Sequence, residues 1–449
     1  MDIVSQKLGT QSALKSFFDY FIPTLLGMML MSVNIVVDGV FVGNGVGALA
    51  LAGVNIAVPV FSIIISIALL IGMGGGTLYS MAMGEGDGDK AKRIFTKAMI
   101  LVTVLTLIAA AISFVNMEAL ARLFGANADT LPYVIDYMTV LLASALIIAL
   151  ESAISIFVRN DGDPQLAMIG LVVTALTNIG LNYWMIFILE LGVTGAALAT
   201  VIATAIGLAI YTIHFFKKGS GLKLTTFTWN KKEVQSIITI GFPAFLSEAG
   251  MGVFVMGYNI AMSIHVGTNG LAAFSVINYL HTFMFLAFIS IGSTIQPMIS
   301  YYYGAKKRDM IKSTVKIAEV VGTVLGLIFI GIGFFGADFL VSVFGVESTD
   351  IANKAATGIK QFFLAYLFMG INFIYMTYYQ SIGQVAPSIW ITLFRGFILL
   401  IAMLIILPLA FGITGIWLAL PAAEAIVATV LIIFARNGVM TQGQDSRGF

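Results

Sequence analysis

The sequence predicts an all-α integral membrane protein with about twelve transmembrane helices in two six-helix lobes. Of its 449 residues, 59% are hydrophobic and only 10% are charged, against about 25% charged residues in a soluble domain. The apolar runs are long and continuous, whereas the strands of a membrane barrel would alternate apolar and polar residues. Because lipid admits only helices and closed barrels, these observations indicate a helical bundle.

Each membrane-spanning helix needs about 20 mostly apolar residues. The predicted spans, in order, are 17–40, 48–75, 94–116, 132–158, 166–188, 193–216, 235–262, 270–300, 313–336, 356–380, 386–410 and 413–435. We expect the first run to be a mature helix, because it is long and lacks the small-residue cleavage site of a signal peptide. The predicted domains are an N-lobe (1–216), a polar cytoplasmic linker (217–234), a C-lobe (235–436) and a disordered cytoplasmic tail (437–449).

The two halves of the chain repeat each other at a spacing of about 220 residues. Pro23 matches Pro243, and GVTGAALA (192–199) matches GITGIWLA (412–419). An even number of helices per half returns the chain to the same side of the membrane. The halves should therefore be related by a pseudo-twofold axis along the membrane normal, an arrangement that favours a secondary transporter.

Lysine and arginine are concentrated in alternate loops, which predicts the orientation of the helices. With a cytoplasmic N-terminus, the outer loops contain only Arg122, Lys354 and Lys360. All other loop lysines and arginines would then be cytoplasmic. We expect a multi-pass protein of a bacterial inner (plasma) membrane with both termini in the cytoplasm.

Several functional classes lack their sequence signatures. No GxxxxGK[ST] motif is present, the glycine-rich GEGDGDK (84–90) is typical of a solvated loop, and there is no cysteine. His214, His265 and His281 are scattered, without metal-ligand spacing. We therefore expect neither an enzyme nor a cofactor or bound metal, and no nucleic-acid partner. Transport would be passive or driven by an ion gradient.

Asp38, in NIVVDGVFVGN (34–44), is the only charged residue between Tyr20 and Gly84. A charge at bilayer depth costs roughly 3 kcal/mol or more, and such groups usually face the bundle interior and handle ions. A buried carboxylate can exchange a proton for a cation, because desolvation favours the neutral acid and a nearby cation favours the charged form. The alternative places Asp38 at the outer interface, in contact with water. Its counterpart in the second half is Tyr258, so ion handling should belong to the first half.

Other polar residues within the predicted spans have two interpretations. Glu151, Glu248 and Glu424 either act directly or form structural pairs, and Arg395, the only clearly buried base, could neutralise one of them. Asn178 and Asn182 lie four residues apart on one helical face, and Thr200 lies in the next helix. Such groups can also simply join helices, at about 0.6 kcal/mol each. Segment 362–380 is rich in aromatic residues and methionine, which suits either an adaptable drug pocket or ordinary packing.

These residues resemble the MATE family of multidrug and toxic compound extrusion transporters, most closely its bacterial DinF/MepA-like branch. The resemblance covers about residues 13–436 and rests on a series of motifs. These are VVDGVFVG (36–43), FVRNDGDPQLAM (157–168), TNIGLNYWMIF (177–187), GVTGAALAT (192–200), GFPAFLSE (241–248), QPMISYYYGA (296–305) and QSIG (380–383).

The resemblance implies two six-helix lobes around a V-shaped cavity and the export of amphipathic, often cationic drugs in exchange for protons or sodium. It implies that Asp38 is the ion-coupling residue of the N-lobe, within a polar site formed by Asn34, Asn178, Asn182 and Thr200. Pro23 is the expected hinge of the first helix. Candidate substrate or second acidic residues are Glu248, Gln296, Tyr258 and Tyr375. We expect a monomer that interacts with small molecules and the lipid bilayer.

One position departs from the family pattern, which often has Asp where this chain has Asn182. The neutral amide removes a like charge from Asp38 and one carboxylate from a possible sodium site near it. Proton coupling is therefore favoured, with sodium coupling as an alternative. A lipid-linked oligosaccharide flippase of the same superfamily is a further alternative, although it would need several basic residues in its cavity. A membrane enzyme or a receptor would need a catalytic cluster or a signalling domain.

Overall fold

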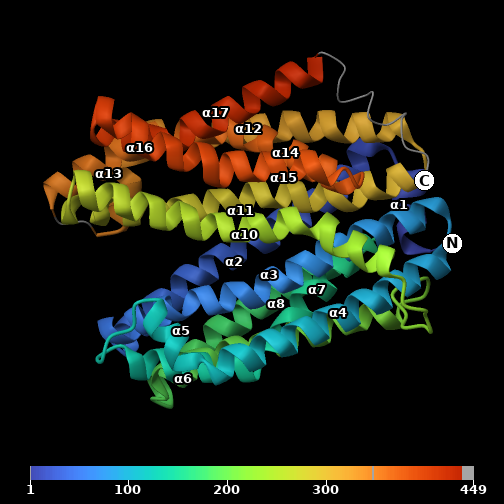
Figure 1. Cartoon of the computed structure of the whole chain (residues 1–449), viewed down its shortest axis with the longest axis horizontal. Helices are drawn as coiled ribbons and strands as arrows, with labels where there is room; N and C mark the ends of the chain where they lie inside the picture. The colour runs from blue at the N-terminus through green and yellow to red at the C-terminus, as the bar shows by residue number, and fades with distance from the viewer. Residues whose placement is uncertain (1, 346–347, 437–449) are drawn as a thin grey trace. The chain divides into compact units, whose positions relative to one another are not determined.

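A computed structural model describes residues 2–345 and 348–436, and within this part every regular element is helical. The predicted tail at 437–449 lies outside the described residues. The helices of the first half are α1 (Ile3–Thr10), α2 (Ala13–Gly45), α3 (Ala48–Glu85), α4 (Gly88–Val115), α5 (Met117–Leu123), α6 (Leu131–Ala143), α7 (Ala145–Asn160), α8 (Pro164–Tyr183) and α9 (Gly192–Thr212) (Figure 1). The π-helix η1 (Trp184–Ile188) continues α8, and the 3₁₀ turn η2 (Ile213–Phe216) continues α9.

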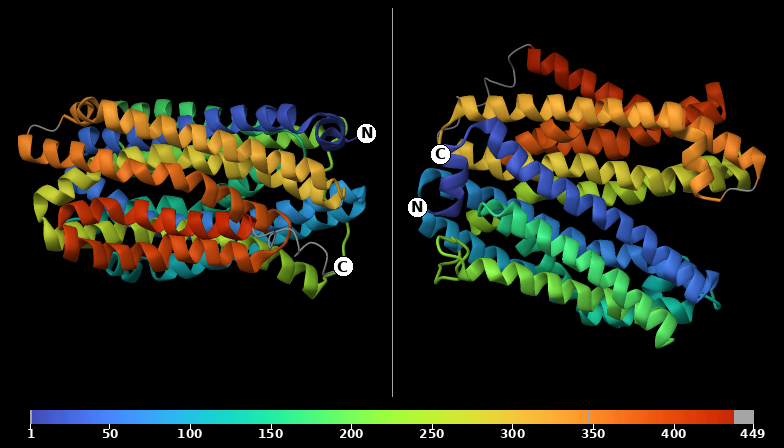
Figure 2. Two further views of the ribbon diagram at one scale, coloured as in Figure 1. Left: turned by 90° about the horizontal axis from the view of Figure 1, so that it is seen from above. Right: turned by 180° about the vertical axis from the view of Figure 1, so that it is seen from behind.

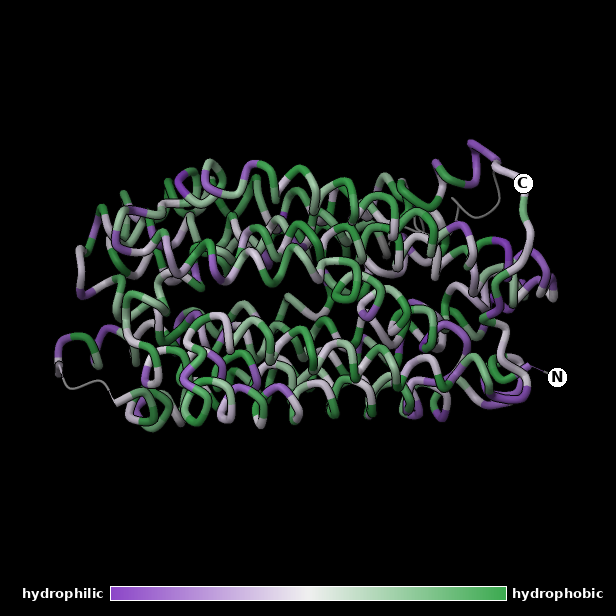
Figure 3. Tube along the Cα trace, turned by 90° about the horizontal axis from the view of Figure 1, so that it is seen from below, coloured by the Kyte–Doolittle hydropathy of each residue, from purple (hydrophilic) through white to green (hydrophobic). Residues whose placement is uncertain are grey.

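The second half contains further long helices. They are α10 (Lys231–His265), α11 (Thr268–Gly304), α12 (Arg308–Val343), α13 (Thr349–Phe362), α14 (Tyr366–Ser381), α15 (Val385–Leu393), α16 (Leu399–Phe411) and α17 (Ile413–Arg436). The 3₁₀ turn η3 (Phe363–Ala365) joins α13 to α14, and the π-helix η4 (Phe394–Ile398) joins α15 to α16. Figure 3 shows mostly hydrophobic residues along the helices and many of the hydrophilic residues toward their ends.

The predicted helical membrane bundle is confirmed. Among the described residues, 11 helices are long and apolar enough to cross a membrane, and the bent pair α6 and α7 raises the number of spans to 12. That pair corrects the expectation of one continuous helix over 132–158. Its axis bends by 57° at Ser144, whose φ of −108° and ψ of 9° leave the helical region. No proline or glycine lies at the bend, and these are the residues that usually mark a kink in a sequence. The continuous apolar run over 132–158 therefore did not predict it.

The chain divides into two compact units. The first comprises 1–249, 293–314 and 380–383, and the second comprises 250–292, 315–379 and 384–449, as far as it is described. The first unit thus holds segments from both halves of the sequence, and the predicted division into an N-lobe, a linker and a C-lobe stays a prediction. Within the first unit, α8 and α9 pack against each other and against α2 (Figure 2).

Glycines allow α3 and α10 to approach closely within the first unit. A Cβ atom on Gly241 would lie 1.6 Å from the carbonyl oxygen of Leu70, and one on Gly74 would lie 1.8 Å from that of Ile237. The obstacles are backbone atoms, so a side-chain rotation cannot relieve either clash. The two helices therefore touch along their backbones, as small residues allow in membrane bundles.

We expect Gly241→Ala to lower the free energy of unfolding by about 1–3 kcal/mol, because α3 and α10 must separate to admit the methyl group. Chemical denaturation in detergent micelles measures this change. The control is Gly252→Ala on the same helix, where a Cβ atom would meet nothing within 4 Å. Equal stability of the two variants would show that the backbone contact does not hold the helices together.

Candidate functional site

Asp38 lies in the second half of α2, half-buried, with amide donors on both carboxylate oxygens. Asn182 Nδ2 donates to Oδ1 at 2.7 Å, and Asn34 Nδ2 donates to Oδ2 at 3.3 Å. Asn34 precedes Asp38 by four residues, one helical turn, so α2 itself aligns the two side chains. Asn182 comes from the last turn of α8 and is 1% exposed. The sequence-predicted partners of Asp38 therefore meet it in the folded chain.

Asn178 and Thr200 complete the polar site. The Asn178 amide fits in two orientations, because its oxygen and nitrogen are assigned from the hydrogen-bond network. In one, Nδ2 donates to Thr200 Oγ1 at 3.2 Å and Oδ1 accepts from Asn182 Nδ2 at 3.0 Å. In the other orientation, in which the amide oxygen and nitrogen of Asn178 are exchanged, the nitrogen donates to Asp38 Oδ1 at 2.7 Å and the oxygen accepts from Thr200 Oγ1 at 3.2 Å. Either way α2, α8 and α9 are joined through this site.

Tyr137 is a neighbour of the site that sequence reasoning missed. It comes from α6, and its hydroxyl forms a hydrogen bond with Thr200. Nothing in its local sequence marks it, because aromatic residues are common in membrane helices and only the packing of α6 on α9 brings it here. Within the described part of the chain, no salt bridge involves Asp38. The carboxylate is thus surrounded by neutral hydrogen-bonding groups.

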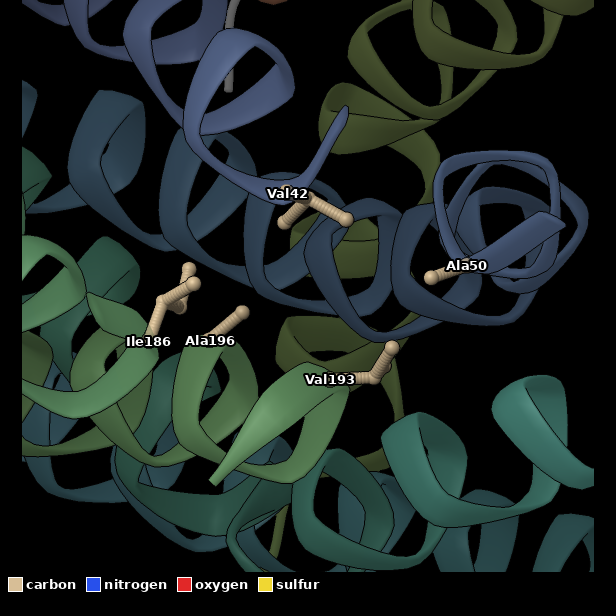
Figure 4. Close-up of a cluster of buried hydrophobic side chains, with 5 residues drawn as sticks. All are labelled: Val42, Ala50, Ile186, Val193 and Ala196. Carbon is tan, nitrogen blue, oxygen red and sulfur yellow. The ribbon is translucent and has the colours of Figure 1, made fainter. Parts of the chain in front are cut away.

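An apolar cluster lies about one helical turn beyond the polar site, on α2, on η1 that continues α8, on α9 and on α3. Figure 4 shows its buried side chains, which are Val42, Ala50, Ile186, Val193 and Ala196. Val42 follows Asp38 by four residues, and Ile186 follows Asn182 by four. Because all five side chains are at most 5% exposed, the cluster excludes water from this side of the carboxylate.

Two predicted substrate residues, Glu248 and Gln296, lie in the first unit with different partners. Ser62 Oγ donates to Glu248 Oε1 at 3.3 Å, which ties α10 to α3. Gln296 is 2% exposed, and its Nε2 donates to Thr77 Oγ1 and to Asn160 Oδ1, both at 3.1 Å. None of these contacts connects Glu248 or Gln296 with Asp38.

The other two, Tyr258 and Tyr375, lie in the second unit. The Tyr258 hydroxyl accepts from the backbone N–H of Leu420 at 3.0 Å, and its ring stacks on Phe274 with centroids 4.9 Å apart. The Tyr375 hydroxyl donates to Glu319 at 2.7 Å.

The predicted hinge, Pro23, lies buried inside α2, fifteen residues before Asp38. The functional roles of Pro23, Tyr258 and Tyr375 stay predictions.

Arg395 pairs with Glu424, as expected for a buried base that neutralises an acid. Arg395 Nη2 and Nε donate to Glu424 Oε1 at 2.7 and 3.1 Å, and Asn372 Nδ2 donates to Oε2 at 2.6 Å. The guanidinium carbon also lies 4.1 Å from the centre of the Phe373 ring. Both carboxylate oxygens of Glu424 thus accept hydrogen bonds within the second unit. The expectation that Arg395 is the only buried base is wrong, because Arg159 is 8% and Lys97 3% exposed.

Arg395→Met should lower the free energy of unfolding by about 3–5 kcal/mol, because it leaves the Glu424 carboxylate buried without a cation. Adding Glu424→Gln should recover most of the loss while keeping an acceptor for Asn372. Denaturant unfolding in detergent measures both variants. Glu118→Gln, which breaks an exposed pair with Arg122, is the control and should change stability by less than about 1 kcal/mol. A double variant as unstable as Arg395→Met would contradict the pairing.

A second charged cluster, also missed by sequence reasoning, lies at the α7–α8 loop of the first unit. His214 is fully buried, and its two ring nitrogens contact Asp161 Oδ2 at 2.7 Å and Asp163 Oδ2 at 3.1 Å. Asp161 also accepts from the Tyr79 hydroxyl at 2.6 Å, and Lys217 forms an ion pair with Asp163. The cluster closes the loop against the start of the linker. The sequence did not indicate this cluster, because His214 lies about 50 residues from Asp161 and Asp163 along the chain.

Burial by itself would raise the pKa of Asp163, but hydrogen bonds and charges from His214 and Lys217 outweigh it and hold the pKa well below its ordinary value. Because the pKa of Asp163 is lower in the folded than in the unfolded chain, its charged form stabilises the fold. This contribution is fully present above the pKa of the unfolded chain, about 3.9, and is lost as the pH falls below that value.

Asp163→Asn should therefore lower the free energy of unfolding at neutral pH by about 1–3 kcal/mol. The difference from the wild type should shrink below about pH 4, where the Asp163 carboxyl of the unfolded wild-type chain begins to protonate. Asparagine still caps α8, as Asp163 does by accepting from the Leu166 N–H at 3.3 Å, so the variant isolates the charge. Unfolding across this pH range measures the effect, with exposed Asp129→Asn as control. A pH-independent difference would rule out the charge interaction.

Known proteins match nearly the whole chain. The model of the MatE family matches residues 23–184 and 243–411. The multidrug export protein MepA of Staphylococcus saprophyticus is 26% identical over 434 residues, covering 96% of this chain and 95% of the relative. The protein of the same name from Staphylococcus haemolyticus is 26% identical over 439 residues, covering 97% and 96%.

Two solved structures share the fold. One is the outward-facing conformation of a multidrug resistance MATE family transporter of the MOP superfamily, with a TM-score of 0.92 and 23% identity, covering 97% of this chain and 98% of that one. The other is a MOP superfamily transporter from Pyrococcus furiosus, with a TM-score of 0.91 and 21% identity, covering 98% of each chain. At these identities the likeness shows the fold alone.

Proposed function

Because the chain belongs to the MATE family of membrane transporters, we propose that it is a proton-coupled multidrug efflux antiporter of a bacterial plasma membrane. It would export amphipathic, often cationic organic compounds, in line with the multidrug export proteins to which it is similar. The observation that carries the proposal is Asp38, a carboxylate inside a membrane helix whose partners are all neutral.

The donors around Asp38 support a proton over sodium as the coupling ion. Sodium needs oxygen ligands, whereas Asp38 Oδ1 faces the Asn182 amide nitrogen at 2.7 Å and also faces that of Asn178 when its amide is turned over. An N–H donor stabilises a carboxylate but cannot coordinate a cation. With an N–H donor on each oxygen, the Asp38 carboxylate has fewer lone pairs left for a metal ion, and a remaining lone pair can still accept a proton.

Asn182 offers a way to accommodate the protonated state. Its Oδ1 is buried and has no hydrogen-bond partner. A neutral Asp38 would carry an O–H donor, and a half-turn of the Asn182 amide would present this oxygen to it. Asn182 can thus donate through its amide nitrogen to the Asp38 carboxylate and accept through its amide oxygen from the protonated Asp38. Such an exchange would change the bonds that join α2 to α8 and so couple protonation to a movement of α2.

The driving force is sufficient for export. One charge that crosses 100 mV is worth about 2.3 kcal/mol. Since about 1.4 kcal/mol corresponds to a factor of ten, each net charge moved supports a drug gradient of roughly 40-fold. This term applies when one proton is exchanged for a neutral drug, whereas exchange for a monovalent cationic drug moves no net charge and is driven by the proton concentration gradient.

We expect purified protein in liposomes to move a fluorescent cationic dye when a proton gradient is imposed and not when a sodium gradient is imposed. Asp38→Asn should reduce this flux to the level of protein-free liposomes, because the amide cannot carry the proton. Exposed Asp136→Asn is the matched control and should transport as the wild type does. Flux driven only by sodium would overturn proton coupling. Full activity of Asp38→Asn would move the coupling role to another acid, and Glu248 would be tested next.

A further inference from the structure

Polar side chains at four-residue spacing line three helices of the first unit that pack against one another. On α7 they are Glu151, Ser155 and Arg159; on α8 Thr174, Asn178 and Asn182; on α9 Thr200, Thr204 and, two turns on, Tyr211. Residues four apart share one face of a helix. We refer to these nine residues as the polar seam. It runs from the Asp38 site toward the α7–α8 loop, where Asp161 and His214 lie.

Glu151 lies midway along the polar seam and is incompletely paired. It is only 8% exposed, and its Oε1 has no hydrogen-bond partner, while Ser152 Oγ contacts Oε2 at 3.5 Å. The hydroxyl of Thr174 is also buried without a partner. Both atoms border Gly207, where a Cβ atom would lie 2.0 Å from Thr174 Oγ1 and 3.4 Å from Glu151 Oε1. An unpaired acceptor and an unpaired hydroxyl therefore face the same point.

The charges around Glu151 do not form an ion pair with it. Among the described residues, the ionisable groups that act on it are Arg159, two turns along α7, and Tyr211 from α9. The helices α3, α4, α6 and α8 also pack on α7 and contribute none. No salt bridge joins Glu151 to Arg159 in the described part of the chain. Tyr211 donates to the Ala167 carbonyl at 3.2 Å.

A purely structural acid would have a different environment. Glu424 shows what that environment looks like in this protein, since donors occupy both its oxygens and a cation neutralises it. Among the described residues, Glu151 has no cation paired with it, and only Tyr211 and Ser152 act on it as hydrogen-bond donors, while its Oε1 has no partner. Its carboxylate form is therefore less stabilised than that of Glu424, and its unpaired oxygen and the Thr174 hydroxyl both border Gly207. Buried ionisable groups of this kind mark proton paths in membrane proteins.

Resting on the proposed coupling at Asp38, we propose that Glu151 is a second proton-binding carboxyl of the transport cycle. A proton that leaves the Asp38 acid is bound by the Glu151 carboxylate and then released to water at the α7–α8 loop. Asp38 thereby regains its negative charge, Glu151 becomes neutral, and the release restores its charge. The hydroxyls of Thr200, Thr204 and Thr174 lie along the polar seam between the two carboxyls and can each accept one proton while giving up another.

Infrared difference spectra between high and low pH, recorded on the purified protein, test the proposal directly. A protonated carboxyl has its own C=O band, which a glutamine or asparagine lacks. Among the bands of the wild type, we expect one that is lost in Asp38→Asn and another that is lost in Glu151→Gln. Thr174→Val should shift the Glu151 band, because it removes the hydroxyl that faces the acid. The absence of a band sensitive to Glu151→Gln or Thr174→Val would overturn the proposal.

Dye flux in liposomes separates this proposal from the coupling role of Asp38. Glu151→Gln should slow proton-driven flux several-fold and flatten its dependence on internal pH, while dye binding in detergent is unchanged. Glu151→Asp, which keeps a proton-binding group, should recover part of the rate. If Glu151→Gln transports with wild-type rate and pH profile while Asp38→Asn is inactive, only the role of Glu151 fails. If Asp38→Asn is fully active, the proposed coupling site itself fails.

Discussion

The energetic penalty of a carboxylate inside an apolar helix bundle is the constraint on which the first unit depends. Asp38 has no cation beside it, so its stabilisation must come from neutral donors on other helices. Asn182 at 2.7 Å and Asn34 at 3.3 Å provide them, and Asn178 and Thr200 extend the network to α9. The packing of α2, α8 and α9 is thus tied to the charge state of one side chain. A change in that charge alters the hydrogen bonds that hold three helices together.

The two halves of the chain use equivalent positions for different chemistry. Asp38 corresponds to Tyr258 and Thr200 to Leu420 at the spacing of the repeat. In the first half Asn178 and Asn182 connect these positions, whereas in the second half they are joined directly by a bond from the Leu420 N–H to the Tyr258 hydroxyl at 3.0 Å, next to the stacked Phe274 ring. The buried acid there, Glu424, is neutralised by Arg395. Equivalent positions in the two halves therefore carry different chemistry, and the described part of the first unit holds three acids with neutral partners within its membrane helices, Asp38, Glu151 and Glu248.

Close backbone contacts explain why small residues recur in this chain. Gly74 and Gly241 let α3 and α10 meet along their backbones, and Gly207 leaves room beside Glu151. Within a lipid bilayer the hydrophobic effect does not drive the association of helices. Close van der Waals packing and interhelical hydrogen bonds stabilise their contacts instead. The same residues that permit packing also decide where polar atoms can approach each other. The gap at Gly207, bordered by two unpaired oxygens, is one result.

Residue types and their spacing determined much about this protein before any contact was known. Hydrophobic run lengths predicted the spans, the repeat predicted two related halves, and the isolation of Asp38 marked it as a candidate ion-handling residue. Helical spacing placed Asn178 and Asn182 on one face, but only the resemblance to the MATE family assigned them to the site of Asp38. These features are local, because each depends on neighbours within a few turns or on composition. Tertiary structure alone decided the 57° bend at Ser144, the approach of Tyr137 to Thr200 and the pairing of His214 with two aspartates. It also decided that Glu424 is neutralised while Glu151 is not, because the partner of a buried charge comes from another helix, and sequence spacing does not determine which helices meet.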